Sequence, residues 1–316
     1  RPASQGSSAY GLAVDIGTTS VAVMLVDLEN GWIKGVESSL NEQVAYGFDV
    51  ISRIDYSSKG SENLKELQRR IVQGINQLIG QLCKEYRIVS GEIYEMVVVG
   101  NTTMMHLFLG LEAKNMALSP YISATTNPHS LAAGELGIDI HPAGEIHVLP
   151  GIASFVGSDT VAVILATSLH RSRKTILAID LGTNGEVALA YKGRLYVAST
   201  AAGPAFEGGG IQYGMRAVKG AISSFSLENG EISYSVIGNT APKGICGSGL
   251  IDIVASLYKA HIINNTGRLL SRNELDGGDP MIREIGNRIR EKDNKREFLL
   301  YSDYYGKEVV LTQQDI

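Results

Sequence analysis

The sequence predicts an α/β protein made of two domains with similar topology. One stretch, Ala178–Ala188 (AIDLGTNGEVA), repeats in altered form a stretch near the start of the chain, Ala13–Val23 (AVDIGTTSVAV). Each copy has an apolar run, an Asp, a Gly-Thr turn and then alternating apolar residues, which predicts a β-hairpin with a polar tip on a buried sheet. The shared Asp, Gly and Thr are each 165 positions apart. So long a period indicates two related domains rather than a solenoid, with a ligand held between the two tips.

The two predicted tips carry groups that suit a phosphate. Gly17 and Gly182 permit tight turns in which consecutive backbone N–H groups converge on an anion. Thr18, Thr19 and Thr183 add hydroxyl donors beside those turns.

The aspartates of the repeat further restrict which ligand could bind. Asp15 and Asp180 would repel a bare phosphate, so they fit only with a cation between, most simply Mg²⁺ that keeps its waters. The alternative is a pair of ordinary hairpins in which Asp and Gly serve turn chemistry. The duplication favours the phosphate interpretation.

Composition excludes several classes of protein. The 316 residues are 44% hydrophobic and 19% charged, which suits one large or two medium globular domains. A net charge of −5 argues against a nucleic-acid partner, and no apolar run approaches the ~20 residues needed to span a bilayer. The two cysteines, Cys83 and Cys246, lack a Cys-x-x-Cys partner, which argues against a zinc or iron–sulfur site in this chain and fits a cytoplasmic protein. Because the chain starts at Arg1 rather than Met, we expect a fragment or processed product, with Arg1–Ala9 as a flexible linker.

The first domain is expected to continue from its hairpin with a strand over Trp32–Ser38. Asn41–Ile54 is too polar for a buried strand and is expected to hold a short helix. Asp49 and Arg53 within it have the spacing of a helix ion pair, with a functional role as the alternative. Glu62–Tyr86 has the periodicity of a long amphipathic helix.

Two strand-to-helix junctions follow in the first domain. Glu95–Thr103 predicts a buried strand with a Gly-Asn turn, after which Thr102 or Thr103 caps a helix over Met104–Leu109. Open α/β sheets bind ligands at such junctions. Leu118–Ala143 is predicted to be a long, partly ordered excursion.

A strand over His147–Leu149 precedes the second junction. There Ser158 or Asp159 is expected to cap a helix that runs to about Leu169. The alternative for Asp159 is a carboxylate directed toward the ligand.

The second domain is expected to open at Thr175 with its hairpin and a further strand over Leu195–Thr200. The three consecutive glycines of Gly208–Gly210 would allow a purine or ribose to lie on the backbone, and a loose loop is the alternative. A run of small residues then leads into a helix over Leu250–Ile263. The charge-dense Arg283–Lys295 is predicted to be a solvated face.

The paired Asp-x-Gly-Thr motifs resemble the phosphate motifs of the actin, sugar-kinase and heat-shock chaperone ATPase superfamily. Further segments are similar to the C-terminal ATPase region of the reductive activators of corrinoid proteins. They are Asn41-x-Gln43 with Tyr46–Arg53, Val99–Met104, Val156–Thr160, Leu181–Glu186, Gly203–Gly208 and Gly244–Asp252.

This resemblance implies two ribonuclease-H-like (actin-like ATPase) domains with a nucleotide cleft between them. The first would cover residues 10–173 and the second 174–316, with the second incomplete at its C-terminal end. ATP turnover would drive reduction of Co(II) to Co(I) in a corrinoid protein of a methyltransferase system, with electrons from an N-terminal [2Fe–2S] domain absent here. A second copy of the chain is a further candidate partner.

The resemblance also assigns residues to the ATP site. The first phosphate loop would contain Asp15, Gly17, Thr18 and Thr19, and the second Asp180, Gly182, Thr183, Asn184 and Glu186. Gly100 and Asn101 would lie at the interdomain connection, and Gly208, Gly209 and Gly210 near the adenosine. Asp15 and Asp180 would hold Mg²⁺, and we expect them to face each other across the cleft. Because phosphoryl transfer needs a positioned water, Glu186 or Asp159 is expected to orient it.

The end of the chain departs from the superfamily pattern. Thr312–Asp315 has the form of a capping box, yet the helix it should begin and the adenosine motif that normally follows are missing. We therefore expect residues after Leu311 to be poorly ordered, or pinned by another piece of the protein, and ATP to bind more weakly than to a full-length chain.

Two rival functions use the same cleft. A small-molecule kinase would need a carboxylate base, for which Asp159 or Asp49 could serve. A nucleotide-gated interaction module would need no catalysis at all.

Overall fold

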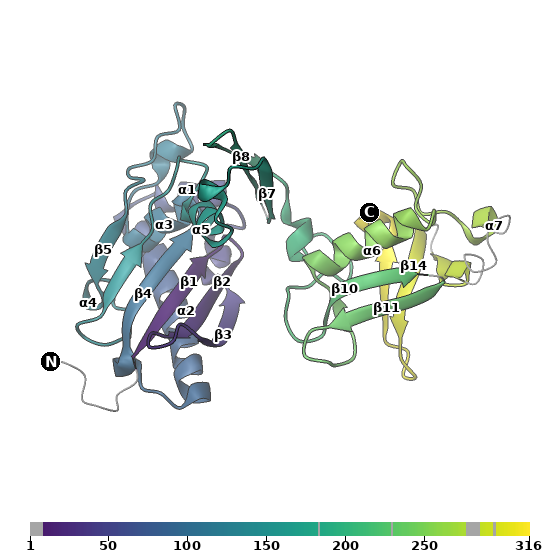
Figure 1. Cartoon of the computed structure of the whole chain (residues 1–316), viewed down its shortest axis with the longest axis horizontal. Helices are drawn as coiled ribbons and strands as arrows, with labels where there is room; N and C mark the ends of the chain where they lie inside the picture. The colour runs from purple at the N-terminus through teal and green to yellow at the C-terminus, as the bar shows by residue number, and fades with distance from the viewer. Residues whose placement is uncertain (1–8, 183, 229, 276–284, 293–294) are drawn as a thin grey trace. The chain divides into compact units, whose positions relative to one another are not determined.

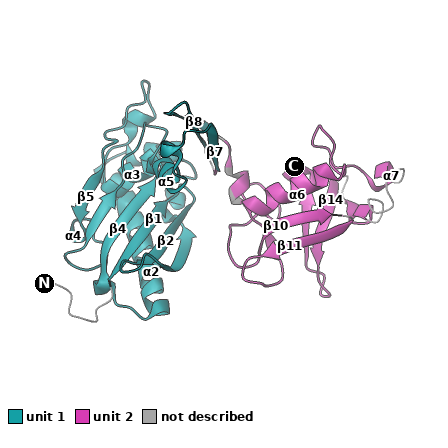
Figure 2. Cartoon of the chain, in the orientation of Figure 1, with its two compact units in different colours: residues 1–180, 186–200 teal, residues 181–185, 201–316 magenta. Residues whose placement is uncertain are grey.

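The computed structural model describes residues 9–182, 184–228, 230–275, 285–292 and 295–316. The predicted linker Arg1–Ala9 lies almost wholly outside these residues, as do Thr183 and part of Arg283–Lys295. Contacts divide the chain into two compact units (Figure 2). Unit 1 comprises residues 1–180 and 186–200, and unit 2 comprises residues 181–185 and 201–316.

Unit 1 is built on a six-stranded mixed sheet (Figure 1). Its strands are β1 (Tyr10–Ile16), β2 (Ser20–Asp27), β3 (Ile33–Leu40), β4 (Ile93–Gly100), β5 (His129–Ala132) and β6 (Glu145–Val148), in the order β3-β2-β1-β4-β6-β5. β1 pairs antiparallel with β2 and parallel with β4, which places Asp15 opposite Val99. The predicted first hairpin, its third strand and the α/β class are confirmed.

The core of unit 1 lies between this sheet and its helices. α2 (Ser61–Tyr86) matches the predicted amphipathic helix, and its apolar face joins the buried residues of β1, β2 and β4 in one cluster. That face consists of Leu67, Ile71, Ile75, Leu78, Ile79 and Leu82, each at most 1% exposed. Burial of an aliphatic side chain contributes about 1.5–3 kcal/mol, so this face fixes α2 on the sheet.

The predicted helix caps were wrong at two junctions. α3 (Thr102–Leu109) is capped by Asn101, whose side chain accepts a hydrogen bond from the Met104 amide, so Thr102 and Thr103 are its first helical residues. α5 (Ser158–Ala166) has Gly157 at its N-cap and no side-chain cap. The cap is the last residue with an extended backbone before the helix, and in both cases it lies one or two residues earlier than the predicted candidates.

Two other regions of unit 1 differ from prediction in part. Asn41–Ile54 holds the predicted short helix as α1 (Val50–Ser57), preceded by a 3₁₀ turn (Glu42–Tyr46), but Asp49 caps α1 instead of pairing with Arg53. The supposed excursion Leu118–Ala143 contains the short edge strand β5 and the single-turn α4 (Ala133–Leu136). Four-residue elements are too short to show a hydrophobic period.

The second predicted hairpin is confirmed. β7 (Ile176–Leu181), β8 (Asn184–Tyr191) and β9 (Arg194–Ala201) form a sheet in the order β7-β8-β9. The Gly182 amide donates to the Asn184 carbonyl at 3.0 Å across the turn. Ala188 and Ala190 of β8 pack with Ile164 of α5 in one apolar cluster.

In its described residues, unit 2 combines two further three-stranded sheets with one longer helix. The sheets have the orders β11-β10-β12 and β13-β14-β15. Their strands are β10 (Ala221–Glu228), β11 (Glu231–Val236), β12 (Gly244–Ile245), β13 (Ile289–Lys292), β14 (Lys295–Ser302) and β15 (Glu308–Thr312). α6 (Gly247–Lys259) begins and ends earlier than the predicted Leu250–Ile263, and α7 (Arg272–Leu275) is a single turn. None of the helices in the described ranges is long and apolar enough to cross a membrane.

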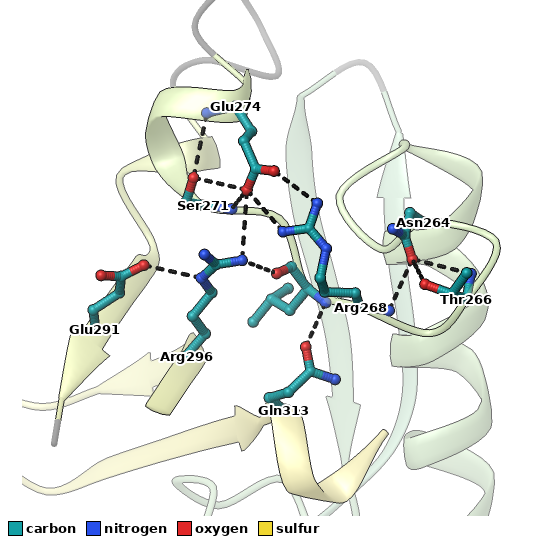
Figure 3. Close-up of polar contacts among 9 residues, drawn as sticks. Asn264, Thr266, Arg268, Ser271, Glu274, Glu291, Arg296 and Gln313 are labelled. Carbon is teal, nitrogen blue, oxygen red and sulfur yellow. Dashed lines mark hydrogen bonds and ion pairs between the residues drawn. The ribbon is translucent and has the colours of Figure 1, made fainter. Parts of the chain in front are cut away.

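The residues after Leu311 are pinned to unit 2, one of the two outcomes predicted for them. The Asp315 carboxylate accepts from the Thr312 amide and hydroxyl, which completes the predicted capping box around the turn Gln313–Asp315. Gln313 accepts from the Leu269 amide at 2.7 Å and donates to the Gly267 carbonyl at 2.9 Å. Figure 3 shows Gln313 near the ion pair between Arg268 and Glu274.

Candidate functional site

The first candidate loop is the turn between β1 and β2. The Gly17 amide donates to the Ser20 carbonyl at 2.8 Å and closes this turn. Thr18 is 6% exposed, and its hydroxyl accepts a hydrogen bond of 2.9 Å from the Asn101 side-chain amide. Because Asn101 also caps α3, it joins the β1–β2 turn to the start of that helix.

A close crossing of two backbones positions the start of α5. Ser158 is fully buried, and its hydroxyl bonds both the amide and the carbonyl of Gly100 at 3.1 Å. A Cβ added to Gly157 would lie 2.4 Å from the Gly100 carbonyl oxygen and 2.5 Å from the Asn101 Cα. The crossing therefore requires glycine at Gly157, and it brings Asp159 to the end of β4 where β1 also ends.

Four predicted site residues of unit 1 form one electrostatic group: Asp15, Asp159, Asp180 and Glu186. Water reaches Asp15, yet the protein atoms around its carboxyl group remove part of its hydration. This desolvation, followed by the charges of Asp159 and Asp180, raises the pKa of Asp15 to about 6. Asp15 and Asp180 therefore lie near enough to interact, within one unit.

Asp159 and Glu186 also titrate above their ordinary range. Burial raises the pKa of Asp159 and outweighs the hydrogen bond of 2.6 Å that its carboxylate accepts from the Thr160 amide. Burial and then the Asp159 charge raise the pKa of Glu186, although Ser199 donates to it at 3.1 Å. Raised carboxyl pKa values bring a group closer to the optimum for proton transfer near neutral pH. Asp159 is not the N-cap of α5, and its ligand-directed role stays a prediction.

The charge of these four carboxylates suits a cation, since a positive charge between them would offset their mutual repulsion. Among the described residues, however, no three His, Cys, Asp or Glu side chains are grouped to hold a metal ion directly.

The remaining predicted residues are placed as follows. Gly182 and Asn184 form the turn of the second hairpin, while Thr183 lies outside the described residues. Gly208 and Gly210 have left-handed backbone angles, with φ of 83° and 79°. A Cβ on Gly208 would lie 2.5 Å from the Met215 amide nitrogen. This close contact within the chain is itself a sufficient reason for glycine at the position, without any ligand. Gly209 lies between them in unit 2.

Sequence reasoning missed the buried polar side chains beneath the first loop. Asn41, Gln43 and Arg53 are each at most 1% exposed. The Asn41 side-chain amide donates to the Gly17 carbonyl at 2.8 Å, and Arg53 donates to the Thr18 carbonyl. The sequence offered one signal for these residues: they lie in a polar segment between apolar strands, and that segment matches a motif of the family.

The raised pKa of Asp15 predicts a pH-dependent stability. The folded-state pKa of about 6 exceeds the unfolded value of 3.8, so ionisation opposes folding, and stability falls as the pH rises from about 4 to 6. Asp15→Asn should therefore raise the Tm at pH 7–8 and leave it unchanged below pH 4. After discounting for the exposure of Asp15, we expect a rise of about 2 °C.

Thermal unfolding in EDTA between pH 4 and 8 measures this effect. Asp55→Asn is the control, because Asp55 pairs with Lys59 at 3.2 Å on an exposed surface and should give no such rise. A Tm difference for Asp15→Asn that is the same at every pH would contradict the electrostatic origin.

Comparison with known proteins assigns the chain to a family. Residues 10–172 match the family described as "RACo middle region", and residues 174–316 match the "C-terminal domain of RACo the ASKHA domain". A protein of Eubacterium limosum, "Corrinoid activation enzyme RamQ", is 42% identical over 97% of this chain and 51% of its own length. The "[Co(II) methylated amine-specific corrinoid protein] reductase" of Methanosarcina barkeri is 28% identical over 69% of this chain and 41% of its own.

A solved structure extends this likeness to the fold. The "Reductive activator for corrinoid,iron-sulfur protein" aligns with a TM-score of 0.86 and 40% identity over 99% of this chain and 49% of its own. The chain therefore spans about half the length of the relatives that it matches. The sequence matches, the sheet orders and the structural match agree: this chain belongs to the RACo family and carries its middle region and its C-terminal ASKHA domain, an actin-like ATPase fold.

Proposed function

We propose that this chain is the ATP-binding and ATP-hydrolysing part of a reductive activator that converts a corrinoid protein from Co(II) to Co(I). The observation that carries the proposal is the group of Asp15, Asp159, Asp180 and Glu186 beside the Gly17–Thr19 turn, in which burial and then neighbouring carboxylate charges raise the pKa values of Asp15, Asp159 and Glu186. The corrinoid substrate is supported by the names of the similar proteins.

Each part of the proposed ATP site has its own role. The first loop, with Asp15, Gly17, Thr18 and Thr19, and the second loop, with Asp180, Gly182, Thr183 and Asn184, would bind the phosphates. Gly100 and Asn101 would hold the first loop in place, and Gly208, Gly209 and Gly210 would lie near the adenosine. We propose a division between the domains near residues 173 and 174, as in the family matches, whereas the compact units of the structure keep residues 174–180 and 186–200 with the first unit.

Mg²⁺ fits this donor set, because Asp15 and Asp180 interact with each other and are oxygen ligands, which that ion prefers. When bound, the ion would neutralise phosphate charge. Asp15 and Asp180 would hold it through its water molecules, while Glu186 or Asp159 accepts a proton from the attacking water.

The electron source and the cellular setting are the wider parts of the proposal. The electron would come from a [2Fe–2S] domain preceding this region, and the corrinoid partner would belong to a methyltransferase system. Cys83 and Cys246 are both free thiols, which fits the cytoplasm.

The test follows the cobalt spectroscopically in the full-length protein, with its corrinoid partner, a reductant for the iron–sulfur group, and Mg²⁺. We expect Co(II)-to-Co(I) conversion to require ATP. Equal conversion with and without ATP, or ATP consumed only when a small hydroxyl compound becomes phosphorylated, would overturn the proposal.

A further inference from the structure

Arg53 is a buried cation without a buried counter-ion. It is fully buried, the largest such side chain among the described residues, and forms no ion pair with any of them. Burial lowers its pKa to about 10, opposed by the charge of Asp49, so the guanidinium keeps its charge at neutral pH. Taking a charge out of water is strongly unfavourable unless it is compensated. If the side chain at position 53 served packing alone, an apolar residue would be more favourable there.

The contacts of Arg53 converge on the first loop. Its Nε donates to the Gly47 carbonyl at 2.9 Å, and one terminal nitrogen donates to the Gln43 side chain at 3.3 Å. The other terminal nitrogen donates to the Thr18 carbonyl. Gln43 is fixed in turn by a bond of 2.8 Å to the Leu67 carbonyl of α2, so the guanidinium is held from two sides.

Three successive carbonyls of the loop are held by this buried set. Asn41 donates from its side chain to the Gly17 carbonyl at 2.8 Å and from its backbone to the Thr19 carbonyl at 3.0 Å. Arg53 holds the Thr18 carbonyl between them. In a planar trans peptide the C=O and the following N–H point in opposite directions. Holding the Gly17 and Thr18 carbonyls toward the buried side therefore turns the Thr18 and Thr19 amides away from Arg53.

We propose that Arg53, oriented by Gln43 and supported by Asn41, is a positioning residue for polyphosphate: it fixes the first loop with its amides toward the phosphates and places a buried positive charge behind them. The proposal rests on the proposed ATP site. It assigns to these three residues a role in discriminating phosphate-bearing ligands, because the loop and the charge act on the phosphates and not on the adenosine.

The ratio of ATP affinity to adenosine affinity tests this role. Calorimetric titration with each ligand in the presence of Mg²⁺ should show that Arg53→Met lowers ATP affinity at least about tenfold and leaves adenosine affinity unchanged. Arg53→Lys, which keeps the charge but not the fork of donors, should recover part of the loss. Arg70→Met is the control, because Arg70 is a partly exposed arginine that pairs with Glu66 at 2.9 Å and should leave the ratio unchanged.

The outcomes separate this inference from the proposed function. If the unaltered protein binds ATP no better than adenosine, the proposed function fails. If it prefers ATP but Arg53→Met retains that preference, or lowers both affinities equally, only the inference fails. If Arg53→Met does not fold, Asn41→Asp is tested in its place. That change keeps the side-chain oxygen that accepts from the Gln43 backbone amide at 3.1 Å, but it loses the N–H that donates to the Gly17 carbonyl. An unchanged ratio in that variant would also overturn the inference.

Discussion

Glu186→Gln should reduce ATP hydrolysis by about 10²–10³-fold while ATP affinity stays within about twofold of the unaltered protein. The amide still accepts the hydrogen bond that Ser199 donates at 3.1 Å, so the side chain keeps its position. It loses the ability to take a proton from the attacking water. Phosphoryl transfer depends on positioning and charge neutralisation, so one misplaced or unactivated water is enough to slow the step.

Asp159→Asn is the matched variant, since Asp159 belongs to the same group of carboxylates and its pKa is also raised by burial. If Glu186 contacts the water, as this prediction assumes, Asp159→Asn should change the rate by less than about tenfold. Glu145→Gln is the control, because Glu145 is exposed on β6 and remote in sequence from both loops. Single-turnover hydrolysis together with calorimetric ATP binding gives both quantities. Unchanged turnover in Glu186→Gln and in Asp159→Asn would remove both candidates.

The elements that could be predicted from the sequence were those marked by a repeated motif or by a long periodic run of apolar residues. The first and second hairpins were found because an Asp-x-Gly-Thr motif recurs with alternating apolar residues on its far side. α2 was found because its 26 residues hold one continuous apolar face. Both signals depend on local periodicity, which the tertiary structure preserves.

The features that were missed depend on contacts between distant residues. Arg53 has the i, i+4 spacing of a surface ion pair with Asp49, but its acceptors include Thr18, which is 35 residues away in sequence. The cap of α5 was misplaced because Ser158 is committed to Gly100, 58 residues away, and not to its own helix. No property of the local sequence distinguishes such a residue from an ordinary cap or ion pair.

The crossing of Gly100 and Gly157 predicts opposite effects for two glycine-to-alanine changes in unit 1. Gly157→Ala should lower the free energy of unfolding by about 3 kcal/mol, because its Cβ would meet backbone atoms at 2.4 and 2.5 Å that no side-chain rotation can relieve. Its φ of −85° suits any residue, so the loss would come from packing alone. Gly80→Ala should instead raise stability by about 0.5–1 kcal/mol, because Gly80 lies within α2 with no atom near the added Cβ.

Urea unfolding of the two variants measures these changes, and ATP hydrolysis connects them to the site. Relief of the clash requires the start of α5 to move away from β4, and Asp159 is the second residue of that helix. Gly157→Ala should therefore slow hydrolysis more than its loss of folded protein explains, while Gly80→Ala should hydrolyse ATP at the unaltered rate. If Gly157→Ala proved as stable as the unaltered protein, the two backbones would not cross so closely, and Asp159 would not depend on that crossing for its position.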